Sequence, residues 1–280
     1  MKIKIITDST SDISQKDAKD KGIVVVPLKV LFGQEEYRDG IDMETDSFYQ
    51  KLCSEDEVPT TSQPSPADFL KVYEEAKDAN ESIIVITISE KLSGTYQSAV
   101  IAKDLAEYDS IYVVDSMNTV TGLRILVDHA IKMRDEGKEI AEIVNKLEEI
   151  KHKIVLFGIV DTLEYLHKGG RLSRSSSIIG SFLNFKPIIN LKDGLINAVG
   201  KTRGFNKAVF KVYDLIEELG GIDDNYPVVF GYTAESSKAI ILKEKIQEKY
   251  NLKNTSIFPV GAVVGTHAGP GASVITYVKK

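Results

Sequence analysis

Polar residues follow three apolar runs in the first half of the chain, and their side chains could bind a small anionic ligand. TDSTSD follows KIKII, SGTYQSA follows SIIVITI after a short connection, and DSMNTVTG directly follows SIYVV. In a parallel sheet such loops meet at one edge, where hydroxyls and backbone N–H groups favour anions. For any single loop the alternative is helix capping, which Asp, Ser and Thr commonly provide. The candidate residues from these loops are Asp8, Ser9, Ser93, Gly94, Thr95 and Ser116.

A fourth hydroxyl cluster lies in TTSQPSPADF, residues 60–69. Ser65 and Pro66 are typical of a helix start, as the N-cap and the first helical residue. That leaves Thr61 and Ser62 available to bind a ligand. An extended loop leading into the helix would account for the segment equally well, so both interpretations stay open here.

The segment GTHAGPGA, residues 265–272, is expected to be a glycine-rich loop between two strands, and it contains Gly265, Thr266 and His267. Glycine lets a backbone approach a ligand closely, and an imidazole can donate to an anion or act as acid, base or nucleophile. Partial burial with satisfied ring nitrogens is the alternative for His267. We favour a functional His267, whereas the other three histidines are expected to be structural or exposed.

Two basic segments, HKGGRLSRSS and GKTRG, contribute Arg171 and Arg203. Solvated surface charge is the ordinary role of such residues, and a site for phosphate or an acidic partner is the functional alternative. Between them lies IIGSFLNF, which is apolar enough for a core helix or for a wall against an acyl chain.

The composition excludes several classes of protein. The chain has 280 residues and a net charge of −6, which argues against a nucleic-acid binder. Its single cysteine, Cys53, excludes a disulfide framework and a multi-cysteine metal site, so no metal is expected. No apolar stretch approaches the length of a membrane span, and the charged start is unlike a signal peptide, so we expect a cytoplasmic protein. No P-loop, GxGxxG, HExxH or GxSxG motif occurs.

Hydrophobic periodicity predicts an α/β protein with two domains, residues 1–150 and 151–280. The first half alternates strands and helices, which predicts three α/β/α layers around a mostly parallel sheet. The second half contains a hairpin around Asp193–Gly194 and predicts an α/β or α+β domain with a mixed sheet. The predicted strands are 2–8, 22–33 with a bend at Pro27, 82–89, 110–116, 153–161, 227–234, 256–260 and 271–279. The predicted helices are 45–53, 66–78, 93–108, 118–137, 138–151, 205–219 and 236–249.

Taken in order, TDST, TSQPS, SGTYQSA, VDSMNTVTG, GGRLSRSS and GTHAGPGA make the chain resemble the DegV family over essentially all 280 residues. The resemblance implies a two-domain protein that holds one long-chain fatty acid, of the palmitate, stearate or oleate class, between its domains, with no other cofactor. It also implies a non-catalytic carrier, similar to the binding subunit of fatty acid kinase. Such a subunit presents the carboxyl group to a separate ATP-dependent kinase, which makes acyl phosphate for phospholipid synthesis.

By this resemblance Thr61, Ser62, Ser93 and His267 would hold the carboxyl group, and Arg171 and Arg203 would engage the kinase or the acyl phosphate. The remaining candidates would form a secondary part of the pocket: Asp8, Ser9, Gly94, Thr95, Ser116, Gly265 and Thr266. Two alternatives stay open. One is an enzyme resembling dihydroxyacetone kinase, with His267 as a covalent nucleophile, and the other is a regulatory protein that senses fatty acid.

Overall fold

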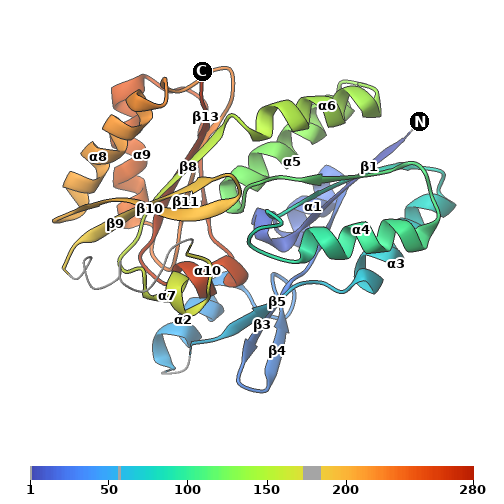
Figure 1. The fold of residues 1–280 in the computed structure, drawn as a ribbon, viewed down its shortest axis with the longest axis horizontal. Helices are drawn as coiled ribbons and strands as arrows, with labels where there is room; N and C mark the ends of the chain where they lie inside the picture. The colour runs from blue at the N-terminus through green and yellow to red at the C-terminus, as the bar shows by residue number, and fades with distance from the viewer. Residues whose placement is uncertain (1, 56–57, 173–183) are drawn as a thin grey trace.

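The computed structural model describes residues 2–55, 58–172 and 184–280, which form three β-sheets with helices around and between them (Figure 1). The first sheet is fully parallel, as the alternation of strands and helices predicts. Its strands, in spatial order, are β2 (Ile23–Val26), β1 (Ile3–Asp8), β6 (Ser82–Thr87) and β7 (Ile111–Asp115).

Helices cover both faces of this parallel sheet, so the predicted three-layer arrangement is confirmed. Successive strand side chains point to opposite faces. Ile5 therefore packs with the helices of one face, α1 (Gln15–Lys21), α5 (Val120–Asp135) and α6 (Ile140–Lys151). Ile6 packs with those of the other face, α3 (Pro66–Asp78) and α4 (Thr95–Ala106).

The second half of the chain forms a six-stranded mixed sheet, again as predicted. Its strands, in spatial order, are β10 (Leu195–Thr202), β9 (Lys186–Lys192), β8 (Ile154–Ile159), β13 (Ser273–Val278), β11 (Val228–Tyr232) and β12 (Thr255–Pro259). Asp193 and Gly194 both have positive φ at the turn between β9 and β10, as the hairpin signal requires. The helices α8 (Phe205–Glu218) and α9 (Ser237–Tyr250) cover one face of the sheet.

A third, antiparallel sheet of three strands was not foreseen as a separate unit. The apolar run 22–33 breaks at Pro27, so that β2 stays in the parallel sheet while β3 (Lys29–Phe32) begins the small sheet. β4 (Glu35–Arg38) pairs with one edge of β3 and β5 (Thr60–Ser62) with the other. Thr61 and Ser62 therefore belong to a strand and not to an extended loop leading into the helix.

Two short helices complete the region between the sheets, α7 (Glu164–Lys168) and α10 (Ala262–Ala268). The prediction of a loop between strands at residues 265–272 is wrong for residues 265–268, which belong to α10 and place His267 in its last turn. Residues 269–272 do form a loop, which leads into β13. Partners far away in the sequence hold this helix. Asp12 Oδ1 accepts a hydrogen bond from the backbone N–H of Gly261 (2.8 Å), and Asp39 Oδ1 accepts one from Ala262 (3.2 Å).

The helix α5 lies between the two large sheets and belongs to a core that both halves share (Figure 1). Leu123 and Leu126 of α5 join Val229 of β11 and Val278 of β13 in one buried cluster. Thr121 Oγ1 also shares a 2.6 Å hydrogen bond with Thr276 Oγ1 of β13. We propose a domain boundary near residue 150, where α6 ends, although α10 packs back against α2 (Thr45–Ser54), β3 and β5.

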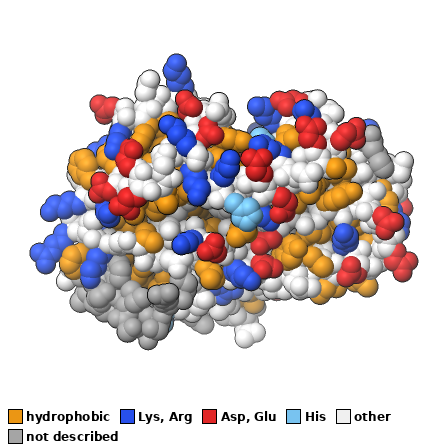
Figure 2. All heavy atoms as spheres, turned by 45° about the horizontal axis from the view of Figure 1, so that its top comes forward, with side chains coloured by type: hydrophobic (Ala, Val, Ile, Leu, Met, Phe, Trp, Pro, Cys, Tyr) orange, Lys and Arg blue, Asp and Glu red, His pale blue; other side chains and the backbone are white. Residues whose placement is uncertain are grey.

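The face of the molecule in Figure 2 carries lysine and arginine side chains interspersed with acidic ones. Among the helices that the structure describes, none is long and apolar enough to cross a membrane.

Candidate functional site

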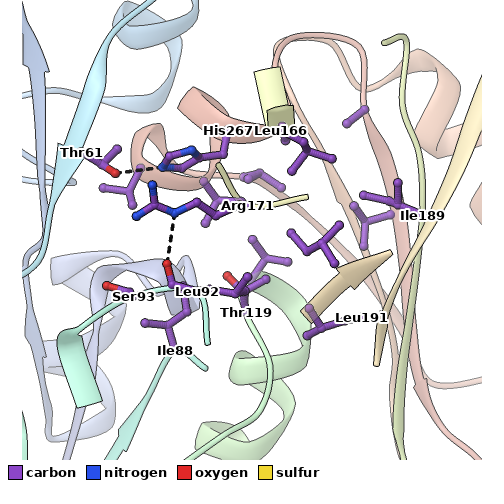
Figure 3. Close-up of a pocket in the computed structure, with 18 of the residues that line it drawn as sticks. Thr61, Ile88, Leu92, Ser93, Thr119, Leu166, Arg171, Ile189, Leu191 and His267 are labelled. Atoms are coloured by element: carbon purple, nitrogen blue, oxygen red, sulfur yellow. Dashed lines mark hydrogen bonds between the residues drawn. The ribbon is translucent and has the colours of Figure 1, made fainter. Parts of the chain in front are cut away.

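A cavity of about 370 Å³ lies between the two large sheets and the small sheet, within the size range of ligand pockets (Figure 3). Its lining comes from the ends of first-half strands, from β5 and α10, and from the face of the six-stranded sheet that α8 and α9 leave uncovered. Apolar side chains dominate the lining, among them Leu156, Ile189, Leu191, Ile196, Val263 and Val274.

The four residues predicted to hold a carboxyl group, Thr61, Ser62, Ser93 and His267, all line this cavity. They come from three separate elements, which are β5, the loop before α4, and α10. Figure 3 shows Thr61, Ser93 and His267 gathered at one end, while Ile189 and Leu191 lie at the other. The cavity therefore has a polar end and a mostly apolar remainder.

Thr61 and His267 are joined directly, with 2.8 Å between Thr61 Oγ1 and His267 Nε2. Burial lowers the pKa of His267 from 6.5 to about 4, and the positive charge of Arg171 lowers it too. The imidazole is therefore neutral at pH 7, where it can donate one hydrogen bond and accept another. Nδ1 is buried without a partner among the described residues.

Ser93 stands in the loop between β6 and α4, and a second hydroxyl holds its side chain. Ser93 Oγ lies 2.8 Å from Thr95 Oγ1, and the backbone N–H of Ser93 donates to the carbonyl of Ser89. Thr95 is fully buried at the first residue of α4. The Ser93 hydroxyl is thus oriented at the polar end of the cavity before any ligand binds.

Arg171 and Arg203 were grouped together in the prediction, but the structure separates them. Arg171 lines the cavity, with its guanidinium between His267 and Ser93 in Figure 3. It donates from Nε to the carbonyl of Leu92 (3.2 Å) and from Nη1 to that of Gly169 (2.6 Å). Arg203 is exposed just after β10, 5.4 Å from the ring centre of Phe185, and does not line the cavity.

The predicted secondary part of the pocket needs correction, because none of its residues lines the cavity. The side chains of Asp8 and Ser9 hold the backbone instead. Asp8 accepts hydrogen bonds from Thr10 and from the backbone N–H of Ile88, while Ser9 accepts from the N–H of Leu28. The residues concerned are Asp8, Ser9, Gly94, Thr95, Ser116, Gly265 and Thr266.

The rest of this set also has local structural roles. Ser116 Oγ donates to the carbonyl of Asn118, and Thr266 Oγ1 donates to that of Ala262. The two glycines permit close packing. A Cβ atom on Gly94 would overlap the side-chain amide of Gln63, and one on Gly265 would lie 2.5 Å from Tyr49 Oη. These residues therefore support the site without facing its contents.

Comparison with known proteins identifies the family. The family model described as "Uncharacterised protein, DegV family" matches residues 2–280. The chain belongs to the DegV family. A DegV domain-containing protein of Caldanaerobacter subterraneus subsp. tengcongensis is 37% identical over 279 residues, which cover 100% of this chain and 99% of the relative.

Solved structures share the fold of this DegV-family chain. One is described as fatty acid binding of a DegV family protein from Thermus thermophilus; it has a TM-score of 0.90 and 32% identity, and the match covers 99% of this chain and 100% of that one. Another is described as a stearic-acid-binding protein from Eubacterium ventriosum, with a TM-score of 0.90 and 28% identity over 100% of this chain and 99% of that one.

Several features of this DegV-family site were not found from the sequence. Gln63 and Thr119 line the cavity, and so do the apolar side chains of β8, β9 and β13. The segment IIGSFLNF, which was expected to be a core helix or an acyl-chain wall, lies outside the described residues except for Asn184 and Phe185. Within the described part of the chain, no group of three or more His, Cys, Asp or Glu could hold a metal ion.

Proposed function

We propose that this DegV-family protein binds one long-chain fatty acid, with the carboxyl group at Thr61, Ser62, Ser93 and His267. The observation that carries this proposal is the distribution of polar groups in the cavity, because the hydroxyls and the imidazole gather at one end of a mostly apolar space. A long-chain acid has the same distribution. The fatty-acid binding described for the relatives from Thermus thermophilus and Eubacterium ventriosum supports it.

Burial of the acyl chain would provide most of the binding free energy. A C16 chain has about 14 methylene groups, and each contributes about 0.8 kcal/mol when removed from water, or about 11 kcal/mol in total. The polar end then fixes the orientation of the chain. Because His267 is neutral, the guanidinium of Arg171 supplies the positive charge nearest to a bound carboxylate.

The direct test is to denature the purified protein, extract it with organic solvent and identify acyl species by mass spectrometry. We expect about one fatty acid per chain. Extracts without acyl species, together with no binding of added oleate or palmitate to the purified protein, would overturn the proposal. A mass adduct on the intact chain would instead favour an enzyme with His267 as nucleophile.

We further propose that the protein presents the bound carboxyl group to a separate ATP-dependent fatty acid kinase. Arg203 supports this step, because its guanidinium is exposed and outside the cavity, where an acidic partner surface or a phosphoryl group can reach it. Arg171 has a different position and is assigned here to the carboxyl end of the cavity.

The two arginines separate binding from transfer. Arg203→Ala is expected to bind oleate with unchanged Kd but to be phosphorylated slowly in a reconstituted assay with a partner kinase and ATP. Arg171→Ala is expected to weaken oleate binding itself. If Arg203→Ala loses oleate as severely as Arg171→Ala while both remain folded, this assignment of roles is wrong.

A further inference from the structure

Thr119 lines the cavity, and its hydroxyl is buried and unpaired among the described residues. The residue as a whole is only 5% exposed. Figure 3 places Thr119 between the polar end and the wall formed by Ile189 and Leu191. A buried hydroxyl without a partner is uncommon and destabilising, so its presence in a mostly apolar lining calls for an explanation.

Helix capping does not explain Thr119. The residue is the N-cap of α5, but its side chain makes no capping hydrogen bond. The other polar side chains of the same loop do have partners. Ser116 Oγ donates to the carbonyl of Asn118 and accepts from its backbone N–H, and Asn118 Nδ2 donates to the carbonyl of Ser116. The unpaired hydroxyl is therefore a property of Thr119 and not of a loose loop.

The backbone next to Thr119 adopts a costly conformation. Val120 has a φ of 43°, in the left-handed region that β-branched residues strongly avoid. Val120 is also buried and lines the cavity. Such conformations persist when the surrounding structure holds them, and they are common at ligand sites. The start of α5 thus has its strained residue and its unpaired hydroxyl at the same place in the cavity wall.

We propose that Thr119 is a second polar contact of the cavity, which binds an oxygen substituent on the acyl chain beyond the carboxyl group. The ligand class would be hydroxylated long-chain fatty acids, accepted alongside unsubstituted ones. An apolar wall disfavours such an acid because its hydroxyl loses water without gaining a partner. Beside Thr119, the hydroxyl of such an acid and the hydroxyl of Thr119 would form a hydrogen bond with each other. This inference rests on the fatty-acid function proposed above.

The test compares binding of stearate with binding of 2-, 3- and 12-hydroxystearate to the delipidated protein. For each hydroxy acid the readout is its affinity relative to stearate. At least one is expected to bind about as tightly as stearate in the wild type. Thr119→Val replaces the hydroxyl with a methyl group of similar size and is expected to lower that ratio about tenfold, while stearate binds equally or more tightly. Thr119→Ser keeps the hydroxyl and should keep the ratio.

Thr121→Val is the matched control, because it makes the same change two residues later on α5. The Thr121 hydroxyl bonds Thr276 and does not line the cavity, so this variant is expected to lose stability but to keep the wild-type ratios. The inference is overturned if the affinity for every hydroxystearate relative to stearate is the same in Thr119→Val as in the wild type. It is also overturned if this variant loses affinity for stearate and for the hydroxystearates equally. Failure of stearate to bind the wild type would instead contradict the proposed function.

Discussion

At the scale of single residues, the polar end of the cavity is arranged before a ligand arrives. The Thr61 hydroxyl is held by His267, and the Ser93 hydroxyl by Thr95. The first pair joins β5 to α10, and the second fixes the loop before α4 to the first residue of that helix. Because these groups already occupy defined positions, a carboxyl group bound there as proposed would not have to order them, which would reduce the entropic cost of association.

This arrangement predicts that Thr61→Val and Ser93→Ala each weaken fatty-acid binding. Removing either hydroxyl leaves a buried carboxyl short of a donor, which costs about 1–3 kcal/mol, or about 5- to 150-fold in Kd. Titration of delipidated protein with palmitate measures the change. Ser65→Ala is the control, because the exposed Ser65 caps α3 and should cost about 1 kcal/mol of stability without affecting Kd. Wild-type affinity in both hydroxyl variants would assign Thr61 and Ser93 a purely structural role.

At the scale of elements, α10 depends on buried carboxyl groups from distant parts of the chain. Asp39 is fully buried, and this burial raises its pKa from 3.8 to about 6 despite hydrogen bonds from Ser9 and from the start of α10. The nearby carboxyl of Asp8 raises it further. The folded state therefore retains a proton on Asp39 at pH values where the unfolded chain has already lost it.

The sign of the resulting pH dependence follows from this difference. Between about pH 4 and pH 6 the folded state binds more protons, so the contribution of Asp39 to stability falls as pH rises. On going from pH 7 to pH 4.5, the wild type should therefore gain free energy of unfolding relative to Asp39→Asn. The expected difference between the two proteins in this gain is about 2 kcal/mol. Urea unfolding at both pH values measures it.

Asp42→Asn provides the control for this experiment. Asp42 is exposed, and its hydrogen bonds with Arg38 lower its pKa to about 2, so it does not titrate between pH 4.5 and pH 7. Its substitution should leave the wild-type pH difference intact. The same pH difference in wild type and Asp39→Asn would show that the Asp39 carboxyl is ionised throughout this range.

The elements also show how far sequence reasoning could reach. Long periodic segments were predicted well. The helices α3 and α8 bury one face and α5 buries most of its length, so the spacing of their apolar residues indicates a helix. The prediction failed at α10, whose β-branched and glycine residues favour helix poorly and whose N-terminus is held by Asp12 and Asp39, over 200 residues away. In the sequence Gly265 is typical of a loop. In the structure α10 requires glycine at this position because α2 packs too closely for a side chain.

The cavity illustrates the same limit for the site. With the resemblance to the DegV family, Thr61, Ser62, Ser93 and His267 could be selected, although the hydroxyl-rich loops alone indicated Asp8, Ser9 and Ser116 equally. The apolar wall could not, because Ile188 faces α8 while its neighbour Ile189 faces the cavity, and the two have the same side chain. Only the packing of the six-stranded sheet against the first half decides which face is left open.

At the scale of the whole molecule, the cavity is a gap in a core that otherwise joins the two halves. Its lining combines Ile88 and Leu92, which follow β6, with Leu156 and Val274 of the six-stranded sheet. A ligand in this gap contacts both halves at once. Filling the cavity should therefore stabilise the chain as one unit and not a single sheet.

This reasoning predicts that palmitate raises the protection of both large sheets from hydrogen exchange. At a free ligand concentration of about 100 times Kd, the stabilisation is about 2.7 kcal/mol. The slowest amides of β6 and of β13, around the fully buried Ile84 and Ile275, should gain equal protection, because both exchange only when the shared core opens. Thr61→Val at the same palmitate concentration should gain less in both sheets. Protection gained by one sheet alone would mean that the halves open independently, with the ligand held by one of them.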